Sequence, residues 1–91
     1  MHYEWDSHKE EINLKKHKVS FSEAKEALIC GNVMVFKEDD EKDEIRYVFM
    51  GISKKLNVLV VVVAYPEEEI TRIISARKAN KKERYIYETQ L

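Results

Sequence analysis

The sequence contains one long uninterrupted apolar stretch, VLVVVVAY at residues 58–65, and most of its side chains are β-branched. Eight apolar residues are far fewer than the roughly 20 that a membrane-spanning helix needs. β-Branched residues favour extended backbone, and a strand that is apolar at consecutive positions is covered on both faces. The stretch therefore predicts a central β-strand with other elements packed on both sides of its sheet.

Shorter strand patterns surround this central strand, at residues 3–5, 33–36, 45–52 and 70–77. In a regular strand Arg72 and Arg77 lie on opposite faces, because their spacing is odd, unless a β-bulge intervenes. The segment 37–44 holds six acidic residues and two lysines, which is too polar to bury, and it predicts a loop.

Asp6, Ser20 and Asn80 have the side chains and the sequence positions of helix N-caps. They predict helices from Asp6 to about residue 17, from Ser20 to the Gly31-Asn32 pair, and from Asn80 through residue 87. The order β-α-α-β-β-β-β-α predicts an α+β domain in which an antiparallel meander sheet carries two N-terminal helices and one C-terminal helix.

The length of 91 residues leaves room for a single domain, residues 1–91, and excludes (β/α)₈ barrels and full dinucleotide-binding folds. The one cysteine, Cys30, excludes an internal disulfide framework and a cysteine-based zinc cluster. The sequence has neither a signal-peptide pattern nor a membrane span, so we expect a cytoplasmic protein without a membrane partner.

Metal and cofactor motifs are not evident: the three histidines have no ligand spacing, and no glycine-rich phosphate loop is present. Lys9 and Lys16 are two helical turns apart and share a helix face, with His17 next to them. Lysine and arginine can hold a phosphate, and histidine can move a proton near neutral pH. With the 2′-hydroxyl of RNA as nucleophile, such residues can cleave RNA without a metal; an ordinary charged surface is the alternative.

Four motifs carry a family resemblance over nearly the whole chain. They are YEWDxxKxxxNxxKHxVxFxxA at residues 3–24, ExRYxxxG at 44–51, RIISARKA at 72–79 and ERxxY at 83–87. Together they resemble the BrnT family of toxins from bacterial type II toxin–antitoxin pairs. The resemblance implies a RelE-like fold and a ribonuclease that arrests translation.

The resemblance also implies partners and site residues. It implies neutralisation by a BrnA-type antitoxin in a heterotetramer of two toxins and two antitoxins, with operator DNA contacted only through the antitoxin. With RNA as the substrate, the catalytic candidates are Lys9, His17, Arg46 and Arg77. The RNA-binding candidates are Lys16, Arg72, Lys78 and Lys81. The basic segment 72–84 is the surface on which we expect the antitoxin.

Two positions depart from the family pattern. Lys18 stands where relatives have a glycine in a left-handed turn, and Tyr65-Pro66-Glu67 stands where many relatives have an arginine after the central strand. The second departure leaves open a catalytically weakened homologue that acts as a protein-binding module. A DNA-binding domain in its own right ranks lowest, because no helix carries a dense basic face suited to a major groove.

Overall fold

The computed structural model describes residues 1–41 and 44–90, with the side chains of residues 37–41 outside that description. Its elements are β1 (His2–Glu4), α1 (Ser7–His17), α2 (Phe21–Leu28), β2 (Met34–Glu41), β3 (Glu44–Ile52), β4 (Val58–Glu67), β5 (Ile70–Lys78) and α3 (Lys81–Thr89). The predicted α+β class and order of elements are confirmed. The predicted N-caps Asp6, Ser20 and Asn80 each accept a backbone N–H.

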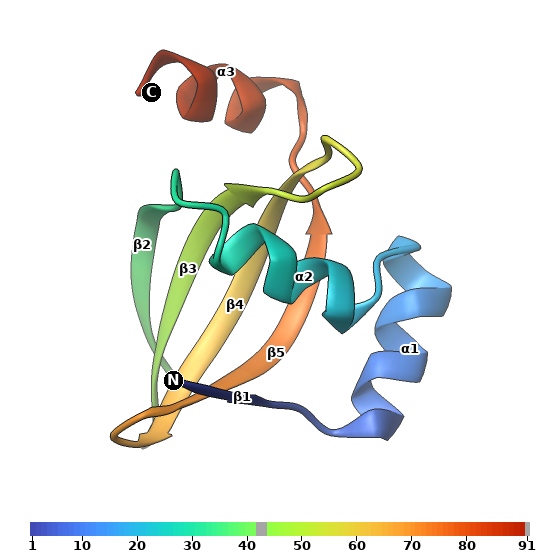
Figure 1. The fold of residues 1–91 in the computed structure, drawn as a ribbon, viewed down its shortest axis with the longest axis vertical. Helices are drawn as coiled ribbons and strands as arrows, with labels where there is room; N and C mark the ends of the chain where they lie inside the picture. Colours follow the sequence, from blue (N-terminus) through green and yellow to red (C-terminus); the bar gives the residue numbers. More distant parts are fainter. Residues whose placement is uncertain (42–43, 91) are drawn as a thin grey trace.

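The strands form one sheet in the order β1-β5-β4-β3-β2, so the apolar stretch lies in the central strand. β2 to β5 form an antiparallel meander, and β1 adds to β5 in parallel, which makes the sheet mixed. Figure 1 shows α2 crossing one face of the sheet, α1 beside β5, and α3 beyond the end of the strands.

The face covered by α1 and α2, called here the closed face, holds the main core. Its fully buried members come from α2, the residue Val19 before it, and the two strands β4 and β5: Val19, Phe21, Ala24, Ala27, Leu59, Val61, Val63, Ile73 and Ala76. α2 approaches β3 so closely that a Cβ at Gly51 would collide with the Ala27 carbonyl. Glycine is therefore required at this contact.

The opposite face, called here the open face, is covered only at one end. There α3 buries Tyr87 against Val48, Met50, Val58 and Val60. The Tyr87 hydroxyl donates a hydrogen bond to the Asn32 carbonyl at 2.8 Å and so fixes α3 to the segment before β2. Within residues 1–41 and 44–90, no helix covers the remainder of this face (Figure 1).

The prediction of a loop at residues 37–44 is wrong for most of that segment, because β2 continues through Glu41 and β3 begins at Glu44. Residues 42–43 lie outside the described residues. β2 is an edge strand that pairs only with β3, and an edge strand tolerates charged residues because it needs no burial on its free side. β4 also extends past its predicted end, through Pro66 to Glu67.

Three irregularities of register interrupt the sheet: one in β5, one in β2, and one between Ala64 and Glu67 of β4. In β5 the partner of Val63 is Ile73 and the partner of Val62 is Ser75, so Ile74 is an extra residue. In β2 the register moves in the same way from Val35 to Lys37, and Phe36 is the extra residue. The simple alternation predicted for residues 70–77 is therefore wrong beyond Ile73.

Candidate functional site

The bulge at Ile74 brings the two arginines of β5 to the same face. Arg72 lies opposite Ala64 of β4 and Arg77 lies opposite Val60. Residues 60 and 64 share a face of β4 because side chains alternate along a strand. Arg46 of β3 also lies opposite Ala64. The open face thus collects three arginines. Without the bulge in β5, Arg72 and Arg77 would lie on opposite faces.

Three adjoining cavities form one groove along β5, with volumes of about 390, 210 and 430 Å³. Ile74 lines all three, and His17 lines both the second and the third. Six of the eight candidate residues line this groove: Lys9, Lys16, His17, Arg46, Arg72 and Arg77. The fold therefore gathers basic residues from α1, β3 and β5 that are far apart in the sequence.

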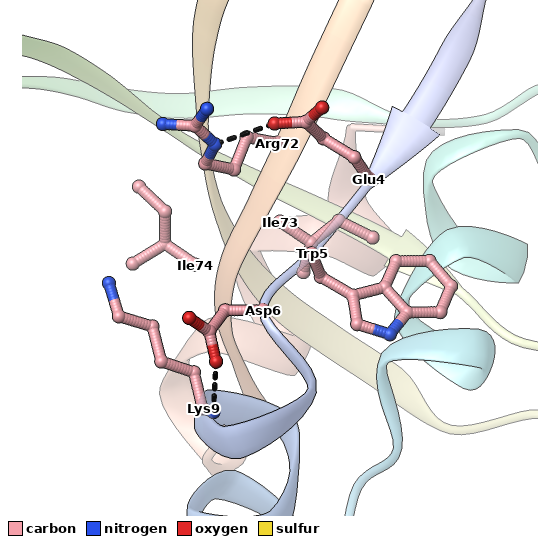
Figure 2. A pocket seen from close by; sticks show the side chains of 7 residues that line it. All are labelled: Glu4, Trp5, Asp6, Lys9, Arg72, Ile73 and Ile74. Atoms are coloured by element: carbon pink, nitrogen blue, oxygen red, sulfur yellow. Dashed lines mark hydrogen bonds and ion pairs between the residues drawn. The ribbon is translucent and has the colours of Figure 1, made fainter.

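Figure 2 shows the end of the groove near β1, where Ile74 lies between Arg72 and Lys9 while Trp5 points the other way. Arg72 donates from Nε to the Glu4 carboxylate at 2.8 Å, and not to the glutamates of the β4–β5 turn. Trp5 belongs to the core: its indole N–H donates to Glu10 at 3.2 Å and its ring packs edge-on against Phe21.

Asp6 serves the helix in this part of the groove. Its carboxylate accepts the backbone N–H groups of His8 and Lys9 at 2.8 and 3.1 Å. The hydrogen bonds from the Lys9 and His8 backbones hold the pKa of the Asp6 carboxyl below its usual value. Asp6 is therefore the anionic N-cap of α1, which fixes the start of the helix that carries Lys9.

Arg77 is held in a bidentate ion pair with Glu83 of α3. Its Nη1 and Nη2 donate to the two Glu83 oxygens, each at 2.8 Å. Glu83 Oε1 also accepts the Asn80 backbone N–H at 2.9 Å, so one carboxylate caps α3 and orients the guanidinium. The hydrogen bonds that Arg77 donates to Glu83 raise the pKa of the guanidinium further above its already high value.

The sequence pointed to Glu83 only as part of a capping box, and its pairing with Arg77 was missed. An arginine in an apolar strand indicates a partner or ligand, but nothing in the local pattern indicates which one. The Arg77 side chain keeps 41% of its surface exposed while that of Glu83 keeps 11%. The guanidinium therefore faces the groove from above a buried carboxylate.

The remaining basic residues of the groove differ in how they are paired. Arg46 is half-buried and its Nε lies 3.4 Å from a Glu44 oxygen. The side chains of Lys9, Lys16 and His17 make no hydrogen bond or ion pair within the part of the chain that the structure describes. His17 is half-buried where the second and third cavities meet.

Asn13 fixes α1 against β5 beside the bulge. β1 pairs with β5 only as far as Arg72, so the backbone of Ala76 lies on an edge with no neighbouring strand. The Asn13 side chain takes that place: Nδ2 donates to the Ala76 carbonyl at 2.8 Å and Oδ1 accepts its N–H at 3.1 Å. A third bond joins Nδ2 to the Val19 carbonyl. Asn13 thus sets the distance between α1 and β5 across the groove.

Two candidate residues are not brought into the groove. Lys78 lies opposite Leu59, a core residue of the closed face, and its charge acts on Glu23 of α2. Lys81 is the first residue of α3 and is exposed. The basic segment 72–84 is therefore divided among the groove, the closed face and α3, and is not one surface.

The two departures from the family pattern have structural counterparts. Lys18 ends α1 in the left-handed conformation with a φ of 62°. Tyr65 lies on the closed face, where its ring centroid is 5.3 Å from that of Tyr47 and burial raises the pKa of its hydroxyl. Tyr65 therefore adds no positive charge to the groove.

The described residues hold neither a metal-binding cluster nor a membrane-spanning helix. Residues 1–41 and 44–90 contain no group of three or more His, Cys, Asp or Glu side chains placed to hold a metal ion. Among the same residues, no helix has the length and apolar character needed to cross a bilayer.

Comparison with known proteins identifies the family to which the chain belongs. Residues 5–83 match the ribonuclease toxin, BrnT, of type II toxin–antitoxin systems. The fold is similar to the 1.1 Å crystal structure of the Brucella abortus ribonuclease toxin BrnT, with a TM-score of 0.66 and 23% identity, over 89% of this chain and 100% of that one. No protein of curated function matches. The family match spans most of the sequence, and the chain belongs to the BrnT family of ribonuclease toxins.

Proposed function

We propose that this chain is an endoribonuclease toxin that cleaves RNA in the basic groove, without a metal ion, and thereby arrests translation. The observation that supports this most is the convergence of six basic side chains from three elements on one groove. A phosphodiester is a suitable ligand for such a groove, because several cations can share the charge of adjacent phosphates.

In the proposed reaction the 2′-oxygen of the substrate attacks the neighbouring phosphorus and the bond to the 5′-oxygen breaks. The 2′-hydroxyl loses its proton and the leaving 5′-oxygen gains one, so the products are a 2′,3′-cyclic phosphate and a 5′-hydroxyl. His17 assists proton transfer, Lys9 holds or protonates the phosphate, and Arg77 stabilises the charge that develops on the phosphorane.

The ion pair with Glu83 is compatible with this role for Arg77. A guanidinium has five N–H donors, and Glu83 takes two of them at 2.8 Å. A longer contact of 3.4 Å joins Nη1 to the Lys78 carbonyl. The remaining donors are available to a phosphate, and the bidentate pair fixes the plane of the guanidinium before the substrate arrives.

A catalytically weakened toxin that acts as a protein-binding module is the second candidate. It is favoured by the pairing of each arginine in the groove with a carboxylate: Arg46 with Glu44, Arg72 with Glu4 and Arg77 with Glu83. The tyrosine at position 65 favours it too, because no cation is added there. Both candidates use the same fold, and only activity separates them.

The family implies an antitoxin partner. We propose a BrnA-type antitoxin that covers the groove with an acidic segment, in a cytoplasmic heterotetramer of two toxins and two antitoxins. Electrostatic complementarity supports this placement, because a bound acidic segment competes with RNA for the same cations. The toxin then reaches operator DNA only through its antitoxin.

The test of the proposed function is cleavage of a labelled RNA oligonucleotide by the purified chain, with and without EDTA. We expect cleavage in both, products that end in a 2′,3′-cyclic or 3′-phosphate, and no cleavage of an oligonucleotide with 2′-deoxyribose at the scissile position. Strict dependence on magnesium would contradict the metal-free reaction. A folded wild-type chain that neither cleaves RNA nor stops growth when expressed alone would favour the weakened homologue.

A further inference from the structure

The bulges at Ile74 of β5 and Phe36 of β2 lie at the same level and on the same face. In β5, Ile74 and Ser75 together oppose Val62 of β4. In β2, Phe36 and Lys37 together oppose Val48 of β3. Because Val48 and Val62 are themselves cross-strand partners, one row crosses four strands and carries an extra residue at each end. Bulges are common next to functional sites, where they change the direction of a side chain.

This row forms an apolar slot in the open face. Val48 and Val62 are its floor, and the half-buried side chains of Phe36 and Ile74 stand on either side. All four line the largest of the three groove cavities, about 430 Å³. α3 packs over Val48, which is 5% exposed, while Val62, Phe36 and Ile74 stay half-buried and line the groove.

Cations lie on both sides of the slot. In the row next to the Val48–Val62 row, Arg46 and Arg72 lie on either side of Ala64. In the row on the other side of the Val48–Val62 row, Arg77 lies opposite Val60. Adjacent rows are two residues apart, about 6.6–6.8 Å along a strand. An apolar slot between two positively charged rows suits a group that is flat and apolar with an anion on each side.

We propose that the slot is a nucleobase subsite, in which an unpaired base of the RNA stacks on Phe36. The phosphates on either side of that base then reach the Arg46–Arg72 row and the Arg77 row. The inference rests on the proposed function in taking RNA as the ligand of the groove. It goes beyond that function in requiring a single-stranded substrate and in assigning base binding to Phe36. Stacking on an aromatic ring tolerates any base, so the subsite selects for unpaired RNA more than for sequence.

The experiment measures the affinity of a short 2′-O-methyl RNA, which binds but has no nucleophile for cleavage, by fluorescence anisotropy. Phe36→Leu keeps an apolar side chain over the core, and Phe36→Trp keeps an aromatic ring. We expect Phe36→Leu to weaken binding roughly 5- to 150-fold, the range for one base–aromatic stack, and Phe36→Trp to restore it. Thermal unfolding of each variant controls for loss of the fold.

A second set of oligonucleotides, with the base removed at each position in turn, makes the test specific. If Phe36 stacks a base, one abasic oligonucleotide binds wild type more weakly and shows no further loss with Phe36→Leu. The subsite is overturned if Phe36→Leu weakens the binding of the parent and of every abasic oligonucleotide equally, or if it weakens the binding of none of them.

Cleavage of unmodified RNA, measured in parallel, separates this inference from the proposed function. RNA that binds in a Phe36-dependent manner but is never cut supports the subsite and contradicts the ribonuclease activity. RNA that is cut equally well by wild type and Phe36→Leu, with equal affinity, overturns the subsite and leaves the ribonuclease activity in place.

Discussion

The closed and open faces of the same sheet are built for different tasks. On the closed face, α1 and α2 bury an apolar layer, and the charged Glu23 of α2 has hydrogen-bond partners. Glu23 accepts the Ser53 hydroxyl at 2.7 Å and an Asn57 N–H at 2.9 Å. On the open face, α3 covers one end only, and Lys9, Lys16 and His17 line the groove without such partners among the described residues. The difference indicates that one face stabilises the fold and the other is available to a ligand.

Arg77 and Lys78 give the sharpest contrast, because adjacent cations point to opposite faces. Arg77→Ala should lower the rate of RNA cleavage by about 100- to 1,000-fold, since it removes one donor to the developing charge. Arg77→Lys should not rescue it, because an ammonium cannot replace the bidentate fork. Lys78→Ala removes the same charge from the closed face and should leave the rate unchanged.

The measurement is single-turnover cleavage, with growth after induction as a second readout. Circular dichroism is required as a control, because Arg77→Ala removes the bidentate ion pair with Glu83 that joins β5 to α3. A folded Arg77→Ala chain that cleaves as fast as wild type would show that Arg46 or Arg72 is the better candidate.

Asn13 joins the two faces, and its removal should have the largest effect on stability. Asn13→Ala removes three hydrogen bonds, to the Ala76 N–H, the Ala76 carbonyl and the Val19 carbonyl. At roughly 1 kcal/mol each, the free energy of unfolding should fall by about 3 kcal/mol. Urea denaturation measures this, with Ile12→Ala as the matched control because Ile12 is 52% exposed on the same helix. Equal effects of the two variants would contradict the role of Asn13.

Glu23 should make the stability of the closed face depend on pH. Burial alone would raise its pKa, but hydrogen bonds from Asn57 and Ser53, together with nearby lysines, hold the pKa below the ordinary value of 4.5. A carboxyl with a lowered pKa in the folded state stabilises the protein above its unfolded pKa. That contribution is lost as the pH falls below about 4.5 and through the folded pKa.

Glu23→Gln should therefore lower the free energy of unfolding by about 1–2 kcal/mol at neutral pH and flatten its decline in acid. Urea denaturation between neutral pH and pH 3 is the measurement. Glu11→Gln, at an exposed position of α1, is the control that should change neither the stability nor its slope. A Glu23→Gln chain whose stability declines in acid as steeply as wild type would contradict this account.

Lys18 should give the smallest effect, and it is a gain. A non-glycine residue in the left-handed conformation is strained, and Lys18 has a φ of 62°. Lys18→Gly should raise the free energy of unfolding by about 1 kcal/mol without changing cleavage, because Lys18 is not among the residues that line the groove. A loss of stability in this variant would show that the contact of the Lys18 ammonium with the Lys15 carbonyl outweighs the strain.

Local signals in the sequence predicted the helices and the central strand well. Asp6, Ser20 and Asn80 cap helices through contacts within three residues, so the pattern and the structure agree. The strand at residues 37–41 was missed because its acidic composition is typical of a loop, while its extended form depends on backbone pairing with β3, which begins at Glu44.

The candidate site was predicted in part for the same reason. Six of its basic residues were named from the sequence, but their convergence depends on the bulge at Ile74, which only the register with β4 reveals. The spacing of Asn80 and Glu83 predicts only a helix cap. The ion pair of Glu83 with Arg77 joins a helix to a strand, and this contact leaves no pattern in the local sequence. Lys78 was included because charge along the sequence does not reveal the face on which a side chain lies.

The central claim is that the open face holds the RNA. NMR mapping of amide chemical shifts during titration with uncleavable 2′-O-methyl RNA tests it without any mutation. The account predicts shifts along the groove, at residues 9–17, 46–48 and 72–77, with the turn at residues 53–57 unchanged. Shifts confined to α2 and the turn at residues 53–57, with the groove unaffected, would contradict it.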